Sequence, residues 1–152
     1  MKIAIGNDHA GVDLKNSLSE HLLENGHTVD DYGTNSIEKV NYPVFAEVVA
    51  KKVASGEYDC GVLICGTGVG VSIAANKVKG IRAAACSEPS TARLAKEHNN
   101  ANIICVGARM VGEQMATDIV DAYIGAEFEG GRHAKRVELI TQLEETGSIY
   151  EE

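Results

Sequence analysis

The sequence predicts a Rossmann-like α/β protein: a single three-layer α/β/α domain over residues 1–152, with a five-stranded parallel sheet and a C-terminal helix. Short apolar runs alternate with segments of helical periodicity, which is the pattern of βαβ units with helices on both faces of a sheet. One run, Gly61 to Cys65, is apolar throughout, as expected for a strand buried on both faces. The length suffices for one such core and not comfortably for two.

The apolar spacing locates the individual elements. Ala10, Leu14, Leu18 and Leu22 recur every four residues, which predicts one face of a helix that ends before Gly26. Strands are expected at Ile3–Ile5, His27–Asp31, Gly61–Cys65, Ile81–Cys86 and Asn102–Val106. Further helices are expected at about 42–54, with Asn41 as N-cap, and at about 69–77, 88–98, 112–123 and 132–145.

Charge and cysteine content exclude several classes of protein. The formal net charge of -8 argues against a nucleic-acid or anionic-membrane binder, because both need a basic surface. The four cysteines form no Cys-x-x-Cys pair, so a zinc ribbon or dithiol redox site is not expected. The sequence shows no signal peptide and no apolar run of membrane-spanning length, and it predicts a cytoplasmic protein with reduced thiols.

Ligands of parallel α/β sheets bind beyond the carboxyl ends of the strands. The residues that directly follow the expected strands are therefore the first candidates for a site. They are Asn7 to His9, Cys65 to Gly70, Ser87 and Glu88, and Gly107 to Arg109.

The turn Cys65-Gly66-Thr67-Gly68-Val69-Gly70 carries the clearest functional signal. Glycines at alternate positions let the backbone approach a ligand, and amides of the turn and the next helix can bind an oxyanion or phosphate. A thiol at that place is expected to have a lowered pKa. The nucleotide fingerprint is absent, since Val71 or Ile73 replaces its third glycine and no Gly-Lys-Ser/Thr follows. A tight turn with an inert, buried cysteine is the alternative interpretation.

Two pairs of polar residues are ambiguous from pattern alone. Asp8 and His9 follow the first strand and can bind sugar hydroxyls or move protons, but Asp8 can equally serve as an N-cap. His98 and Asn99 end a helix, where a histidine often only complements the helix dipole.

Cations gather near the C-terminus of this acidic chain. Arg132 and Arg136 lie one helical turn apart and share a face that suits a phosphate dianion, although a solvated face paired with carboxylates is the alternative. Arg109 is a further candidate. The histidines show no metal-ligand spacing, so no metal site is expected. An anion-binding turn with a thiol and nearby acid–base groups suits proton abstraction next to a carbonyl.

Several separate, ordered motifs make the chain resemble the type B ribose-5-phosphate isomerases, a family that also holds the galactose-6-phosphate isomerase subunits. The resemblance runs from Met1 to about Leu143. It rests on Ile3 to Gly11, Tyr42-Pro43, Cys65 to Lys77, Gly80 to Ala83, Glu97 to Asn99 and Glu129 to His133.

The resemblance implies aldose–ketose isomerisation through a cis-enediolate, with no metal or organic cofactor. It makes Cys65 the base that moves a proton between C1 and C2, because Ala75 stands where other branches of the family carry a glutamate base. Thr67 would assist proton transfer at the sugar oxygens, and His98 would open the furanose ring with help from Asp8.

The binding residues follow from the same resemblance. Backbone amides from Gly66 through Gly68, Val69 and Gly70 to Ser72 would form the hole for the enediolate, and Asn99 would bind a sugar oxygen. The phosphate would be held by His9, Arg109, Arg132 and Arg136.

The resemblance further implies a homodimer, or a tetramer built from dimers, with shared active sites. Tyr42, His98 and Asn99 would then reach the site from the partner, and the helix at 132–145 would pack on that partner. The chain carries both the Cys65 turn and the His98-Asn99 pair, which favours a self-sufficient homomer acting on ribose 5-phosphate. The alternatives are an allose- or galactose-6-phosphate isomerase and a non-catalytic phosphosugar-binding module.

Overall fold

The computed structural model describes residues 1–150 and confirms the predicted fold class. Five parallel strands form one sheet in the order β2-β1-β3-β5-β4. The strands are β1 (Lys2–Asn7), β2 (Thr28–Asp31), β3 (Cys60–Cys65), β4 (Ala83–Ala85) and β5 (Ile103–Gly107). The helices are the 3₁₀ turn η1 (His9–Gly11), α1 (Val12–Glu24), α2 (Tyr42–Ala54), α3 (Val69–Ala75), α4 (Pro89–Asn99), α5 (Glu113–Ile124) and α6 (Arg132–Thr146).

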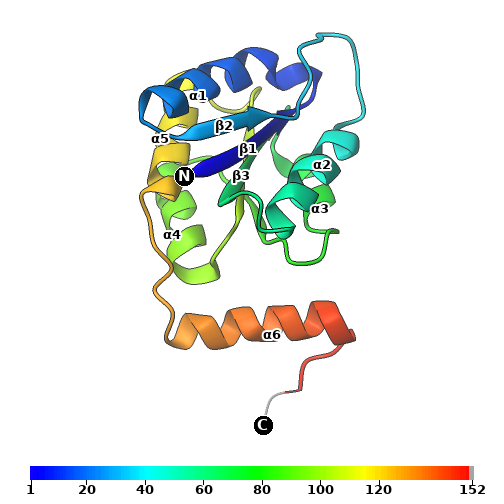
Figure 1. Cartoon of the computed structure of the whole chain (residues 1–152), viewed down its shortest axis with the longest axis vertical. Helices are drawn as coiled ribbons and strands as arrows, with labels where there is room; N and C mark the ends of the chain where they lie inside the picture. The colour runs from blue at the N-terminus through cyan, green and yellow to red at the C-terminus, as the bar shows by residue number, and fades with distance from the viewer. Residues whose placement is uncertain (151–152) are drawn as a thin grey trace.

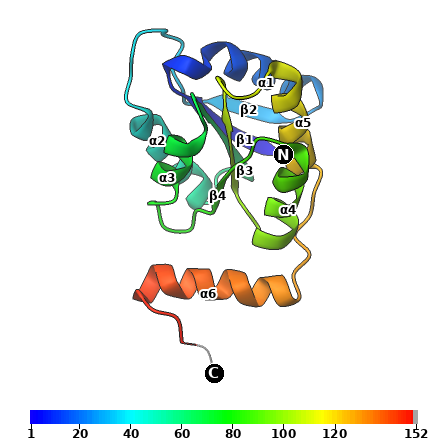
Figure 2. The same ribbon diagram turned by 180° about the vertical axis from the view of Figure 1, so that it is seen from behind.

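Helices cover both faces of the sheet (Figure 1, Figure 2), and an apolar layer lies on each face. Strand alternation separates the two layers: Ile3 and Ile5 pack with residues of α1, α4 and α5, whereas Ala4 between them packs with residues of α2 and α3. Full burial of one such isoleucine contributes roughly 1.5–3 kcal/mol relative to exposure. The sheet is therefore a rigid platform for the turns at its carboxyl edge.

The strand order creates a switch point between β1 and β3. β1 pairs with β2 on one side and with β3 on the other. The connection after β1 therefore leads toward one edge of the sheet, and the connection after β3 leads toward the other edge. The amide of Asp8, just beyond β1, donates to the carbonyl of Ile64 in β3 at 3.0 Å. A switch point of this kind opens a crevice beyond the strand ends.

Several details of the elements differ from the sequence-based expectation. Ala10 lies in η1 and not in α1, because its amide donates to the Asp8 carboxylate at 2.9 Å and the chain forms a 3₁₀ turn first. Asn41 holds the N-cap position of α2 but makes no side-chain capping bond. The helix expected at 69–77 ends at Ala75, and β4 is three residues long.

The short β4 has a local cause. The Asn76 side chain donates to the Ala83 carbonyl at 3.0 Å and accepts from the Ala83 amide at 2.8 Å. The amide of Arg82 donates to the Asn102 side chain at 2.8 Å. Side chains thus form hydrogen bonds with backbone groups that would pair with a neighbouring strand if β4 were longer.

Helix α6 lies apart from the α/β layers and runs below them, beside the end of α4 (Figure 1). The Gly80 amide donates to the Glu144 carboxylate at 3.0 Å, which ties the far end of α6 to the loop before β4. Ile140 and Leu143 remain about half exposed on this helix. Within residues 1–150, no helix has both the length and the apolar content needed to cross a bilayer.

Candidate active site

A cleft of about 430 Å³ lies at the switch point, beyond the carboxyl ends of β1 and β3. Its walls combine a thiol, a carboxylate, a guanidinium, a phenol and a hydroxyl with the backbone of the glycine-rich turn. The lining residues are Asp8, Tyr42, Cys65, Gly66, Thr67, Val69, Gly70, Ile73 and Arg109. The turn that the sequence singled out therefore forms one wall of a cleft.

The Cys65 side chain is held by its own turn. The Gly68 amide donates to the Cys65 sulfur at 3.2 Å. Gly68 adopts φ +79°, and an added Cβ there would lie 2.9 Å from the carbonyl carbon of Val106, so only glycine fits. The turn therefore holds the sulfur at a fixed place in the wall of the cleft.

All four cysteines belong to the two core clusters, but only Cys65 also lines the cleft of Asp8, Tyr42 and Arg109. Burial raises the pKa of Cys60 to about 12 and that of Cys86 to about 11, and it also raises the pKa of Cys105 well above the usual value. These three thiols are therefore protonated near neutrality and behave as small hydrophobic groups.

Some backbone amides of the turn already donate a hydrogen bond within the chain, and others have no acceptor there. The Val69 amide donates to the Thr67 hydroxyl at 3.2 Å, and the Ser72 amide donates to the Gly68 carbonyl at 3.4 Å. The Ser72 hydroxyl donates to the Val69 carbonyl at 2.7 Å, so this side chain bonds within its own helix. Gly70 and Val71 belong to the first turn of α3, where amides have no intrahelical acceptor.

The structure confirms that Asp8 is an N-cap and places it at the cleft, where its role toward a sugar stays a prediction. Its carboxylate accepts from the Ala10 amide and caps η1, and Asp8 also lines the cleft beside Cys65. The neighbouring His9 accepts at Nδ1 from the Val40 amide at 3.2 Å. A neutral His9 therefore carries its proton on Nε2 and is a donor at that nitrogen.

Tyr42 and Arg109 each lie against a glycine of the turn. An added Cβ on Gly70 would lie 2.6 Å from Cζ of Tyr42, and one on Gly66 would lie 3.1 Å from Nη1 of Arg109. The expectation that Tyr42 comes from a partner subunit is wrong, because Tyr42 of the same chain already lies against the turn.

His98 and Asn99 do not approach the Cys65 cleft of their own chain. They end α4, just before β5 begins at Ile103, whereas Cys65 pairs with Gly107 at the other end of β5. At about 3.3 Å per residue, the length of β5 alone corresponds to roughly 13 Å. The two predicted groups therefore lie at opposite ends of the sheet.

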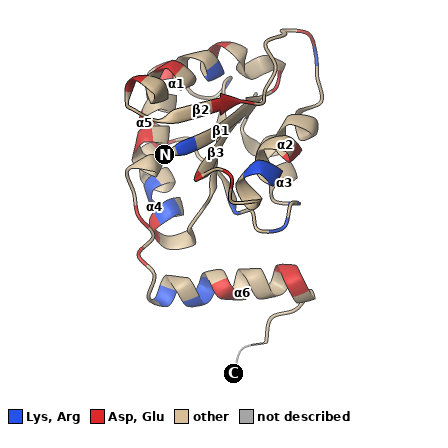
Figure 3. Cartoon of the chain, in the orientation of Figure 1, with Lys and Arg blue, Asp and Glu red and all other residues tan. Residues whose placement is uncertain are grey.

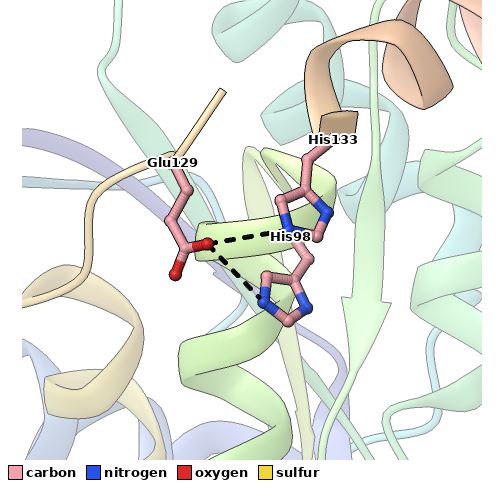
Figure 4. Close-up of side chains that lie close together, drawn as sticks. All are labelled: His98, Glu129 and His133. Atoms are coloured by element: carbon pink, nitrogen blue, oxygen red, sulfur yellow. Dashed lines mark ion pairs between the residues drawn. The ribbon is translucent and has the colours of Figure 1, made fainter. Parts of the chain in front are cut away.

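His98 instead meets Glu129, which lies just before α6, and His133 in the first turn of α6 (Figure 4). Its ring stacks on that of His133, with centroids 4.1 Å apart and planes inclined by 9°. The Glu129 carboxylate lies 3.9 Å from Nε2 of His98 and 3.6 Å from Nε2 of His133. Burial, followed by the neighbouring charges of His98 and Arg132, lowers the pKa of His133.

The cationic group near the C-terminus forms on the first turns of α6, where Figure 3 shows basic residues gathered. Arg132 and Arg136 are both exposed there and do not line the Cys65 cleft. Of the residues expected to bind phosphate, only Arg109 is part of that cleft in the same chain.

Sequence reasoning assigned no role to Glu129 and His133. Both stand in the motif Glu129 to His133, but their proximity to His98 depends on how α6 approaches α4. The amide of Glu129 donates to the carbonyl of Glu97 at 2.9 Å, which fixes this approach. The spacing of four residues between Glu129 and His133 was the available signal.

Fold and cleft together define a Rossmann-like α/β protein with a small-molecule site at a thiol-bearing, glycine-rich turn. Residues 3–140 match the model of the family described as Ribose/Galactose Isomerase. The chain therefore belongs to the ribose/galactose isomerase family, and it is an enzyme of the ribose-5-phosphate isomerase type.

Individual relatives cover nearly the whole chain. It is 55% identical to the ribose-5-phosphate isomerase B of Escherichia coli over 144 residues, which is 95% of this chain and 97% of that protein. It is 50% identical to the galactose-6-phosphate isomerase subunit LacB of Clostridium acetobutylicum over 129 residues, which is 85% of this chain and 75% of that protein.

Solved structures agree with this assignment. The ribose-5-phosphate isomerase B of Clostridium thermocellum superposes with a TM-score of 0.95 at 53% identity, covering 97% of this chain and 100% of that one. The enzyme of Mycoplasma genitalium, solved with bound ribulose 5-phosphate, has a TM-score of 0.92 at 46% identity, covering 95% and 97%.

Proposed function

We propose that the chain interconverts ribose 5-phosphate and ribulose 5-phosphate through a cis-enediolate, with Cys65 as the base. The observation that carries the proposal is the Cys65 sulfur, which receives a backbone hydrogen bond within a polar cleft. The relative from Mycoplasma genitalium, which binds ribulose 5-phosphate in its solved structure, supports the choice of sugar.

The proton transfers follow from this arrangement. The Cys65 thiolate removes the proton from C2 of the open-chain aldose, the C–H electrons form a C1=C2 double bond, and O1 takes the negative charge. Thr67 assists the transfer of a proton from O2 to O1, and the Cys65 thiol then returns its proton to C1. The product is the ketose, and no electron leaves the substrate, so no redox cofactor is required.

The enediolate needs a donor for its negative oxygen. The unused amides of the first turn of α3 and the guanidinium of Arg109 are the available donors in the cleft. Donors that are fixed before reaction stabilise the developing charge without reorganising, and one such donor is typically worth about 2.7–4 kcal/mol. Ser72 is a poorer candidate because its amide already has an acceptor.

The enzyme acts, in this proposal, as a homodimer with shared sites. His98, Asn99, Arg132 and Arg136 lie away from the Cys65 cleft of their own chain, so a second copy must supply the ring-opening and phosphate-binding groups. Exposed apolar side chains support a covered surface. They are Val69 and Ile73 beside the cleft and Ile140 and Leu143 on α6.

A hexose 6-phosphate is the second candidate substrate. The similarity to a galactose-6-phosphate isomerase subunit favours it, since both chains share half of their aligned residues. The same chemistry at C1 and C2 would operate, and only the distance from the turn to the phosphate would change.

A substrate panel tests the proposal. Ribose 5-phosphate, allose 6-phosphate and galactose 6-phosphate are compared by kcat/KM with chelator present. We expect ribose 5-phosphate to give the highest value. A hexose phosphate that outperforms it would replace the proposed substrate, and no turnover of any of the three would overturn the enzymatic reading.

Replacing Cys65 by alanine should lower turnover by about 10²–10⁴-fold, the usual loss when a positioned base is removed. Folding and substrate binding should persist, because the side chain is small and the turn is held by its backbone. The matched control is Cys60→Ala, which removes a protonated thiol from the opposite core cluster and should leave turnover intact. Unchanged turnover in Cys65→Ala would overturn the base assignment.

A further inference from the structure

Three metal-ligand side chains meet where α6 begins. One nitrogen each of His98 and His133 and one carboxylate oxygen of Glu129 all lie within 4.8 Å of one another. Figure 4 shows both rings turned toward the same oxygen of Glu129. The residues come from the end of α4, from the segment before α6 and from the first turn of α6.

His133 gives a second, independent observation at this place. Its side chain is 9% exposed, and its Nε2 atom is buried without a hydrogen-bond partner. Buried polar atoms almost always have a partner, so an unpaired ring nitrogen points to a missing ligand. The nearest polar atom of Glu129 is 3.6 Å away, which is beyond hydrogen-bond length but close to a metal-bridged separation.

The ligand set matches one class of cation. Two imidazoles and one carboxylate are the protein ligands of open zinc sites, with water or another group in the fourth position. Bonds of about 2.0–2.1 Å in a tetrahedral site place ligand atoms roughly 3.3 Å apart. The two distances to the Glu129 oxygen, 3.6 and 3.9 Å, would need to shorten by a few tenths of an ångström, and the two imidazole nitrogens, within 4.8 Å of each other, would also have to move closer.

We propose that His98, Glu129 and His133 bind a divalent transition-metal ion of the zinc class, with a water molecule as the fourth ligand. Nothing in the isomerase chemistry proposed above requires this ion. The proposed metal site is therefore not part of the isomerisation mechanism, although both use the side chain of His98.

Two features make the site weaker than a structural zinc site. The stacked rings are almost parallel, so each must rotate about χ2 before both lone pairs point at one ion. Arg132 stands between Glu129 and His133 in the sequence, and its positive charge opposes a cation. Glu129 offsets part of that repulsion, since its side chain is half exposed and free to move toward the ion.

The proposed ion has a functional consequence, which rests on the proposed role of His98 in ring opening. An imidazole nitrogen bound to a metal can neither donate nor accept a proton. Binding should therefore inhibit turnover of the cyclic sugar, and a chelator should reverse the inhibition.

Cobalt(II) is the probe for binding, because its visible spectrum reports the ligands. The full chain is stripped with chelator, dialysed and titrated with Co²⁺. We expect saturable binding with one ion per chain, a spectrum typical of nitrogen and oxygen ligands, and displacement by Zn²⁺. A thiolate-to-cobalt charge-transfer band would place the ion at a cysteine such as Cys65 and would overturn the assignment.

Two variants and one control locate the site. Glu129→Gln removes an exposed ligand without threatening the fold, and His133→Phe keeps an aromatic ring in the stack but removes both nitrogens. Each should weaken Co²⁺ binding at least tenfold, since loss of even an outer-shell partner costs about 10–100-fold. His21→Gln, at a histidine paired with Asp121 on another face, should leave binding unchanged.

Absence of saturable binding in the wild type, or equal binding in the wild type and in Glu129→Gln, would overturn the proposal. The inhibition is measured separately, as turnover with Zn²⁺ before and after chelation. Binding without inhibition would leave the metal site intact and would count against the ring-opening role of His98. The two proposals therefore fail in distinguishable ways.

Discussion

The Cys65 turn and the cluster of His98, Glu129 and His133 (the His98 cluster) are built in opposite ways. The turn is a contiguous stretch, Cys65 to Gly70, whose backbone fixes one sulfur and several amides at the end of β3. The cluster assembles side chains from α4 and α6, thirty-five residues apart in the case of His98 and His133. Chemistry carried by backbone conformation is thus fixed by local sequence, whereas chemistry carried by converging side chains depends on helix packing.

Each of the two regions carries chemical groups that the other lacks. The turn has a thiol and backbone amides but only Arg109 as a cation, whereas the cluster has two imidazoles, a carboxylate and the nearby Arg132 and Arg136 but includes no thiol. The two regions lie at opposite ends of the sheet in one chain. The proposed dimer joins the turn of one copy to the cluster of the other.

Mixing two inactive variants is the most direct test of an active site shared between two subunits. Cys65→Ala and His98→Ala should each lower turnover by about 10²–10⁴-fold when assayed alone. Subunits exchanged after mixing should regain about a quarter of wild-type activity, because half of the dimers are mixed and each has one intact site. The measurement is turnover before and after co-refolding of equal amounts.

Two copies of the same variant, refolded in the same way, form the control and should stay inactive. If mixing restores nothing although mixed dimers are present, the two residues serve one chain each and the shared-site proposal fails.

Removal of one α6 cation should have a smaller effect. Arg136→Ala should raise KM about ten- to hundredfold, because a hydrogen bond to a charged group contributes about 1.5–3 kcal/mol. Turnover at saturating sugar should change little, since the phosphate is bound equally in ground and transition states.

Lys135→Ala removes the same charge from the neighbouring position of α6 and is the matched control. It should leave KM close to the wild-type value. A loss of turnover with unchanged KM in Arg136→Ala would contradict the phosphate role.

Most of the fold could be predicted from the sequence, and particular residues explain why. The uninterrupted apolar run of β3 and the four-residue spacing of Leu14, Leu18 and Leu22 report burial directly. The short β4 could not be predicted, since the side chains of Asn76 and Asn102 replace ladder bonds through contacts made only in the folded chain.

The candidate site also combines residues that local sequence predicts with residues whose positions depend on helix packing. The sequence could place Cys65, Thr67 and Asp8 at one cleft because they lie at or just beyond strand ends, which the fold brings together. Tyr42 was expected from a partner and proved to lie against Gly70 of its own chain, because the position of α2 over α3 is a packing result. Glu129 and His133 were missed for the same reason.

Chelation should have the smallest effect on activity. It tests whether catalysis depends on the Cys65 turn alone or also on a metal ion at the His98 cluster. If the Cys65 turn supplies the base and the anion donors, turnover of ribose 5-phosphate should be unchanged in EDTA, or should rise where traces of zinc occupied the His98 cluster. The measurement is kcat and KM before and after dialysis against EDTA. Activity that is lost on dialysis and restored by a divalent metal would make the cluster a catalytic metal centre, and the turn would then no longer suffice as the chemical half of the site.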